Sequence, residues 1–170
     1  VQFAHNQLVV HCDLKPSNVL VRADGSAVLL DFGIARVADS KGDDTAGATL
    51  DLVSGQDSGQ TSHTLMTPRY ASPEQLRGEA PGIASDVFSL GLMLFELVTD
   101  SPPPRDRSLP LPLPSQAGQH LLWHRHLSGD IDAIVARACA AIPSQRYSSA
   151  SALGDEVSRM VKHQPVLARE

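Results

Sequence analysis

Residues 83–98 carry apolar side chains on every face of the helix that their spacing predicts. One stripe repeats at helical spacing and consists of Ile83, Val87, Leu90, Gly91, Leu94 and Val98. Further residues fill the remaining faces: Phe88, Leu92, Met93, Phe95 and Leu97. A helix that is apolar nearly all round is buried at the centre of a fold. The sequence therefore predicts that other elements pack around this segment.

Two more amphipathic helices are predicted closer to the C-terminal end. The first is marked by Ile131, Ile134, Val135, Ala138 and Cys139, and the second by Ala150, Leu153, Val157, Met160 and Val161. Ser128 and Asp130 are capping candidates for the first helix, and Ser148 or Ser149 is placed to cap the second. Pro165 follows the end of the second helix.

Strands and loops are predicted from turn residues and composition. The pair Asp24-Gly25 is a strong hairpin signal, so we expect strands near residues 19–22 and 27–30. Residues 37–64 are rich in Asp, Gly, Ser and Thr and are predicted to form a loop. Six prolines between residues 101 and 115 predict an extended connection. The predicted fold class is mainly α, α+β overall, with one small hairpin.

Composition excludes several classes of protein. The chain of 170 residues has 14 Lys+Arg against 19 Asp+Glu, a formal net charge of -5, and no basic run, so we expect no nucleic-acid partner. Its length suffices for one domain or one large lobe with a core of its own. Cys12 and Cys139 are far apart, which fits a reducing compartment.

The residues that could take part in a chemical reaction lie in two short segments. His11-Cys12-Asp13-Leu14-Lys15-Pro16-Ser17-Asn18, followed after the hairpin by Asp31-Phe32-Gly33, resembles the H-R-D-L-x-x-x-N loop and D-F-G turn of the eukaryotic-type protein kinases. Phosphoryl transfer needs a carboxylate that orients and deprotonates a hydroxyl, and separate oxygen ligands for Mg²⁺ on the phosphates of ATP. The resemblance implies that Asp13 is the base and that Asn18 and Asp31 hold the metal. It also implies that Lys15 neutralises the transferring phosphate of bound ATP.

Further segments match the same family in the same order. Residues 67–74 read T-P-R-Y-A-S-P-E, similar to the end of a serine/threonine kinase activation segment, and residues 86–91 read D-V-F-S-L-G, similar to the start of the central helix of the kinase large lobe. Residues 129–135 and 146–166 are similar to bacterial members. The chain is thus identified by resemblance as the C-terminal, large lobe of a bacterial Hanks-type serine/threonine protein kinase, helical with a small hairpin at the catalytic loop.

The resemblance also assigns supporting roles. Thr67 is expected to hydrogen-bond Asp13 and Lys15 and to help select a serine or threonine hydroxyl. Asp86 is expected to accept hydrogen bonds from the catalytic-loop backbone, and Glu74 to pair with Arg146. The remaining supporting residues are His11, Phe32 as a packing residue, and Gly33 as a conformationally permissive one.

Two positions depart from the family pattern. Cys12 stands where many members have an arginine that reads a phosphate on the activation segment, and a thiol cannot make that charge-assisted contact. We therefore expect that phosphorylation does not act through residue 12, although Arg36 could still bind a phosphate. Met66 stands where relatives usually have glycine. A nucleophilic role for Cys12 lacks a third orienting group beside His11. His120 and His124, near His126, have a spacing that could bind a metal in a helix, but no third ligand has a matching spacing.

The resemblance implies a domain plan. We expect the kinase lobe at residues 1–163, with the activation-segment loop at 37–64, a proline-rich connector at 101–118 and the start of a linker at 164–170. No G-x-G-x-x-G loop or V-A-I-K lysine occurs, so the small lobe is expected upstream of Val1 and the isolated fragment is expected to be inactive.

The sequence is compatible with two functions. The first is a serine/threonine kinase lobe that acts on protein substrates with ATP and Mg²⁺, placed in the cytoplasm, whose full-length protein could continue into a membrane segment. The alternative is a non-catalytic, pseudokinase-like docking module or an inactive fragment. The sequence contains all five residues that the resemblance assigns to the reaction: Asp13, Lys15, Asn18, Asp31 and Thr67. Their joint presence favours the enzyme, because a scaffold has no chemical need for all five.

Overall fold

The computed structural model describes residues 1–31, 36–37, 69–106, 110–123, 127 and 129–169. Its longer helices are α3 (Ile83–Thr99), α5 (Asp130–Ala138) and α6 (Ala150–Val161), and its short ones are α1 (Gln2–Asn6), α2 (Pro73–Leu76) and α4 (Pro114–Ala117). Single 3₁₀ turns are η1 (Pro16–Asn18), η3 (Pro143–Gln145) and η4 (Leu167–Arg169). The strands are β1 (Val9–Val10), β2 (Val19–Val21), β3 (Ala27–Leu29) and β4 (Arg36–Val37). The fold is mostly helical with small antiparallel sheets, as predicted.

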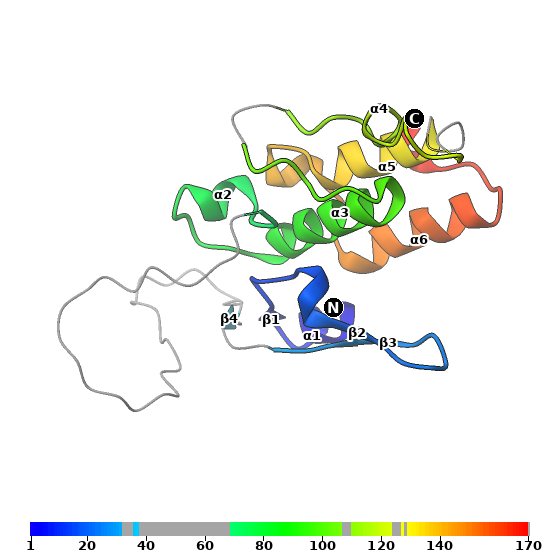
Figure 1. Ribbon diagram of the computed structural model, residues 1–170. Helices are drawn as coiled ribbons and strands as arrows, with labels where there is room; N and C mark the ends of the chain where they lie inside the picture. Colours follow the sequence, from blue (N-terminus) through cyan, green and yellow to red (C-terminus); the bar gives the residue numbers. More distant parts are fainter. Residues whose placement is uncertain (32–35, 38–68, 107–109, 124–126, 128, 170) are drawn as a thin grey trace.

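Helix α3 is the centre of the fold, as the sequence predicts. It contacts α4, α5 and α6, and Figure 1 shows α5 and α6 beside it. The core cluster around it comprises Val87, Ile134, Ala138, Tyr147, Leu153 and Val166. Other elements do not fully cover the C-terminal end of α3, where Leu97 is 79% exposed. Asp100 ends the helix in a left-handed conformation, with φ of 50°.

Helices α3 and α5 approach each other closely at Gly91. A Cβ atom added at Gly91 would lie 2.7 Å from the Cβ of Ala138 and 2.7 Å from the Sγ of Cys139. Real Cβ atoms do not approach other heavy atoms so closely, so glycine is what allows this packing. Cys139 belongs to the packed interior, as predicted, beside a second core cluster of Tyr70, Phe88 and Leu92.

The start of α5 differs from the prediction and the start of α6 confirms it. The residue that caps α5 is Gly129, with φ of 94°, and Asp130 is the first helical residue instead of the cap. Ser128 lies outside the described residues. A glycine is favoured at this junction because its backbone adopts a positive φ that side chains disfavour. Ser149 caps α6 by accepting a hydrogen bond from the N–H of Ala152 at 3.0 Å.

Residues 164–169 belong to the folded unit, whereas the sequence analysis expected a linker from residue 164. Val166 is 4% exposed and lies in the core cluster. The buried Glu156 of α6 accepts hydrogen bonds from the N–H groups of Leu167 and Ala168, at 3.2 and 2.8 Å. Arg169 forms an ion pair with Asp130 of α5 at 2.9 Å. The tail therefore packs against the first residue of α5 and against the middle of α6.

The proline-rich segment ends in a helix, which the prediction of an extended connection through residue 115 missed. Pro114 is the first residue of α4, where a missing N–H costs nothing and the fixed φ suits a helix. Asp132 of α5 holds this helix by accepting hydrogen bonds from the N–H and hydroxyl of Ser115, at 2.9 and 2.6 Å. Residues 101–106 and 110–113 are not helical.

Two small antiparallel sheets occur in the first part of the chain. Strands β2 and β3 pair as the predicted hairpin, with Val19 opposite Leu29 and Val21 opposite Ala27. Gly25 turns the chain with φ of 82°. Strand β1 pairs with β4, a ladder that the sequence analysis did not predict because each strand has only two residues. Within the described residues, no helix has both the length and the hydrophobicity needed to cross a membrane.

Candidate active site

Three polar side chains meet in the loop between β1 and β2. The Nζ atom of Lys15 lies 2.6 Å from Oδ2 of Asp13, and both side chains are largely but not fully buried. The side-chain amide of Asn18 donates to the carbonyl of Asp13 at 2.9 Å and lies 3.5 Å from Oδ2 of Asp13. The turn η1 brings Asn18 back toward Asp13, because Pro16 starts it and the N–H of Asn18 donates to the carbonyl of Lys15 at 3.0 Å. The loop thus gathers a carboxylate, an ammonium and an amide.

Asp31 is placed next to this loop by the residue before it. The N–H of Leu30 donates to the carbonyl of Asn18 at 2.8 Å, and the carbonyl of Leu30 lies 3.2 Å from Nε2 of His11. Leu30 is therefore bound to both ends of the loop that carries Asp13. Asp31 itself is exposed and has a positive φ of 58°.

Asp86 accepts hydrogen bonds from the backbone of this loop, as predicted. It lies in the first turn of α3 and is 1% exposed. Its Oδ2 atom accepts from the N–H of His11 at 2.8 Å, and its Oδ1 atom accepts from the N–H of Cys12 at 2.9 Å. A buried carboxylate with donors on both oxygens is well compensated, and the two bonds fix the backbone that leads directly to Asp13.

His5 is a third partner of Asp86, and the sequence analysis missed it. Its Nε2 atom lies 2.8 Å from Oδ2 of Asp86, and both side chains are 1% exposed. The opposite ring nitrogen, Nδ1, is buried and has no hydrogen-bond partner among the described residues. The residues are 81 positions apart, and no local pattern marks a histidine in a five-residue helix as a partner of α3.

Gln75 is a second residue that the sequence analysis did not single out. It lies in α2, is 8% exposed, and donates its side-chain amide to the carbonyl of Cys12 at 2.8 Å. Part of its role is readable from sequence, because Ser72 and Gln75 have the S-x-x-Q spacing of a helix capping box, which the structure contains. The contact with Cys12, 63 residues away, has no such signal.

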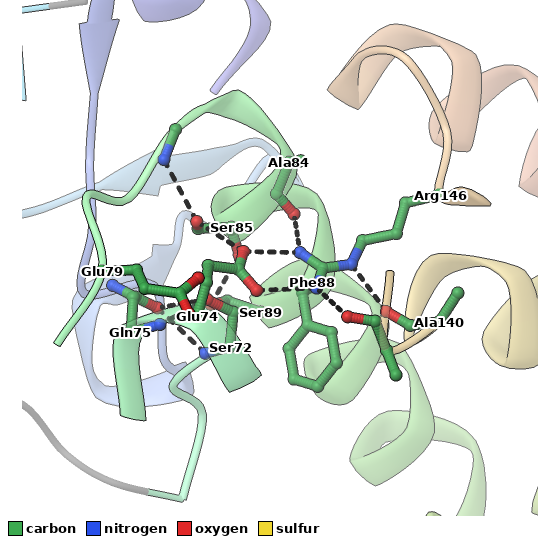
Figure 2. A network of polar contacts seen from close by, with 12 residues as sticks. Ser72, Glu74, Gln75, Glu79, Ala84, Ser85, Phe88, Ser89, Ala140 and Arg146 are labelled. Carbon is green, nitrogen blue, oxygen red and sulfur yellow. Dashed lines mark hydrogen bonds and ion pairs between the residues drawn. The ribbon is translucent and has the colours of Figure 1, made fainter. Parts of the chain in front are cut away.

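The predicted pair of Glu74 and Arg146 is confirmed and is fully enclosed. The guanidinium of Arg146 donates to both oxygens of Glu74, at 2.7 and 2.8 Å, and also to the carbonyls of Ala84 and Ala140, both at 2.8 Å. Figure 2 shows it stacked beside the ring of Phe88, with 4.8 Å between the guanidinium carbon and the ring centre. The pair ties α2 to the start of α3 and to the segment after α5.

The environment of Glu74 strongly favours its charged form. Burial by itself raises the pKa of Glu74, but the hydrogen bonds from Arg146, from its own backbone N–H and from Ser85 and Ser72 outweigh it and lower the pKa to about 2. Ser85 donates to Glu74 at 2.7 Å. Glu74 is therefore a carboxylate at every pH at which the fold is expected to work.

Tyr70 connects the residues before α2 to α3. Its hydroxyl donates to Glu96, and its carbonyl accepts from the hydroxyl of Ser89 at 2.8 Å. Burial and the neighbouring Glu96 raise the pKa of Tyr70 to about 12, so the phenol stays neutral.

Some predicted residues lie outside the described part of the chain: Phe32, Gly33, Met66, Thr67, His124 and His126, as does the side chain of Arg36. His120 is described and exposed. Across the described ranges, no cluster of three or more His, Cys, Asp or Glu side chains could hold a metal ion by itself.

The chain is similar in sequence to known protein kinases. A family model described as protein kinase domain matches residues 1–158. The chain is 34% identical to the serine/threonine-protein kinase PknB of Mycobacterium tuberculosis, over 97% of this chain and 25% of PknB. It is 33% identical to a probable serine/threonine-protein kinase of Streptomyces coelicolor, over 98% of this chain and 23% of that protein. The chain thus spans about a quarter of the length of these curated relatives.

A solved structure shows the same fold. The crystal structure of the PknI kinase domain of Mycobacterium tuberculosis superposes with a TM-score of 0.63 at 23% sequence identity. The superposition covers 94% of this chain and 50% of the PknI chain.

Proposed function

The chain belongs to the protein kinase family, and we propose that it is the large lobe of a serine/threonine protein kinase that transfers the γ-phosphoryl group of ATP to a hydroxyl of a protein substrate. The observation that carries the proposal is the cluster of Asp13, Lys15 and Asn18, with Asp31 tethered beside it. The names of the relatives in Mycobacterium tuberculosis and Streptomyces coelicolor support serine and threonine as acceptors.

Asp13 is assigned as the base. Among the described residues, the contacts of its carboxylate with Lys15 and Asn18 both use Oδ2, which leaves Oδ1 for the substrate hydroxyl. Asp13 takes the hydroxyl proton while the hydroxyl oxygen bonds to the γ-phosphorus and the bond to the bridging oxygen breaks, releasing ADP. Lys15 is paired with Asp13 at 2.6 Å. We assign its ammonium the role of stabilising negative charge on the transferring group.

The residues present fit a bound Mg²⁺. The amide nitrogen of Asn18 is committed to the carbonyl of Asp13 at 2.9 Å, so its Oδ1 is the atom offered to a cation. Asp31 adds an exposed carboxylate, and both are hard oxygen donors of the kind that Mg²⁺ prefers. When bound, the ion neutralises charge on the phosphates of ATP. Thr67 is proposed as the hydroxyl-selecting contact to Asp13 and Lys15.

The remaining residues keep the base in place. Asp86 and His11 hold the backbone on either side of Cys12, and the Glu74–Arg146 pair holds α2 against α3. Their rigid arrangement matters because phosphoryl transfer depends mainly on positioning and charge. The proposed domain plan is a lobe that needs a second, phosphate-covering lobe for turnover.

A transfer assay tests the proposal. The chain is expressed together with the coding sequence that precedes it, and labelled phosphate transfer from ATP and Mg²⁺ to a generic protein acceptor is measured. Asp13→Asn should lower the rate by at least about 100-fold. Asp155→Asn, at an exposed position of α6, is the matched control and should retain full activity. If a well-folded extended protein transfers no phosphate, the proposed enzymatic activity is contradicted. The alternative function, a non-catalytic docking module, is then favoured.

A further inference from the structure

Cys12 adopts a backbone conformation that must be held by its surroundings. Its φ is 69°, in the left-handed region that residues with a side chain rarely enter. Such strained geometry persists only where neighbouring groups determine it. Cys12 also lies directly before Asp13, so any relaxation at Cys12 would turn the carboxylate of Asp13 away.

The peptide groups around Cys12 are held from several elements. The N–H of Cys12 donates to Asp86 of α3 at 2.9 Å, and the N–H of Asp13 donates to Nδ1 of His11 at 3.3 Å. The carbonyl of Cys12, in the same peptide group as the N–H of Asp13, accepts from Nε2 of Gln75 in α2 at 2.8 Å. Gln75 is thus a contact through which α2 reaches this peptide group.

The orientation of the Gln75 amide is determined by Ser72. The Oε1 atom of Gln75 accepts from the backbone N–H of Ser72 at 2.9 Å and from its hydroxyl at 3.1 Å. Since the oxygen faces two donors, the nitrogen is the atom turned toward Cys12. Ser72 is fully buried and Gln75 nearly so, so water cannot easily replace either partner. Figure 2 shows Gln75 beside Ser72, next to the Glu74–Arg146 pair.

Helix capping does not explain why residue 75 is a glutamine. A capping box accepts glutamate as readily as glutamine, because only a side-chain oxygen is needed at that position. The carbonyl of Cys12, in contrast, needs a donor, which a carboxylate lacks. We therefore propose that Gln75 is a positioning residue that fixes the Cys12–Asp13 peptide and thereby the base. Its catalytic meaning rests on the proposed kinase function.

The bond from Gln75 gives the loop a link to α2 that involves no charge at residue 12. The link runs from the Glu74–Arg146 pair through α2 to the peptide before Asp13. It operates without a phosphate group, since an amide and a carbonyl are both neutral at all accessible pH values.

The thiol of Cys12 reports on the link without requiring any enzymatic activity. Cys12 is 6% exposed, so it reacts with iodoacetamide only when the loop opens. Alkylation rates of Cys12 and Cys139 are measured separately by mass spectrometry of their peptides, in the 170-residue chain. Gln75→Glu keeps an acceptor for Ser72 and places a carboxylate against the Cys12 carbonyl, whereas Gln75→Met removes both contacts. Gln119→Met, at an exposed position, is the matched control.

If Gln75 fixes the loop, replacing it should change the alkylation rate of Cys12 and not that of Cys139. Both Gln75 variants should raise the alkylation rate of Cys12 by about five- to tenfold, the scale of one lost buried hydrogen bond. The rate of Cys139 should stay within about twofold, and Gln119→Met should change neither rate. An unchanged Cys12 rate in Gln75→Glu would overturn the proposal. An equal rise at both cysteines would overturn it too, because it would indicate loss of the whole fold.

Turnover separates this proposal from the proposed function. In the extended protein, Gln75→Glu should lower kcat by about tenfold and leave KM for ATP within about twofold. A Gln75 variant in which Cys12 is alkylated faster but kcat is unchanged would overturn the positioning role. If the unmodified extended protein transfers no phosphate, the proposed function fails, while the alkylation result still decides whether Gln75 holds the loop.

Discussion

Replacing Glu74 by glutamine removes the charge that faces a buried guanidinium. The side chains of Arg146 and Glu74 are 0% and 6% exposed, so water does not screen them. The pKa of Glu74 is lowered from 4.5 to about 2. At 1.36 kcal/mol per unit, the ionised carboxylate contributes about 3 kcal/mol to the free energy of unfolding at neutral pH. We expect Glu74→Gln to cost about that amount, because Arg146 stays buried without its counter-charge.

The pH dependence of this loss has a definite sign. A pKa that is lower in the folded state means that the unfolded chain binds the proton first as the pH falls. The stabilisation is therefore complete above about pH 4.5 and is lost toward about pH 2. The difference in unfolding free energy between the unmodified chain and Glu74→Gln should shrink from about 3 kcal/mol at pH 7 to about 1 kcal/mol at pH 3.

Urea unfolding followed by circular dichroism, repeated across this pH range, measures the difference directly. Glu79→Gln is the matched control, since Glu79 pairs with Arg77 at 2.5 Å but both side chains are more than half exposed. This variant should have the same free energy of unfolding as the unmodified chain at every pH, because exposed ion pairs contribute little to stability. Equal losses in the two variants, or a Glu74→Gln loss that does not shrink in acid, would refute the reasoning.

Two further predictions concern packing and the tyrosines. Gly91→Ala should destabilise the chain by about 1–3 kcal/mol, because the added Cβ meets Ala138 and Cys139 at 2.7 Å. Gly154→Ala in α6 should stabilise the chain by roughly 0.5–1 kcal/mol, because a Cβ added there meets no atom within 4 Å. Thermal unfolding measures both variants. Equal midpoints for the two would contradict the close approach of α3 and α5 at Gly91. The chain has two tyrosines, and burial, with Glu96 beside Tyr70 and Glu156 near Tyr147, raises both pKa values to about 12. Stability should fall as the pH rises from about 10 to 12, and phenolate absorbance of the native chain should show no ionisation step near pH 10, where the urea-unfolded chain has one.

Regular patterns and family motifs predicted much of the fold. The apolar residues of α3 indicated a central helix, and Asp24-Gly25 indicated the β2–β3 hairpin, because both signals are local. The Glu74–Arg146 pair and the contact of Asp86 with the loop backbone were predicted by resemblance alone.

Other features depend on tertiary contacts that no local pattern encodes. A lone valine after Pro165 gives no periodicity, so the burial of Val166 and the packing of the tail could not be read from the sequence. His5 and Gln75 reach partners 81 and 63 residues away through single hydrogen bonds. Gly129 at the start of α5 was overlooked because serine and aspartate are the stronger caps in general.

The buried ion pair of Glu74 and Arg146 also sets an order of events during protein synthesis. Glu74 and Arg146 are 72 residues apart, which a ribosome spans in roughly 4–15 s at about 5–20 residues per second. Until Arg146 emerges, burying Glu74 would leave a carboxylate without its cation, so the nascent α2 region has to stay in water. The loop with Asp13 takes its contact with Gln75 from that same region. A chain halted before residue 146 would therefore hold every residue of the proposed catalytic cluster and still lack a stable site.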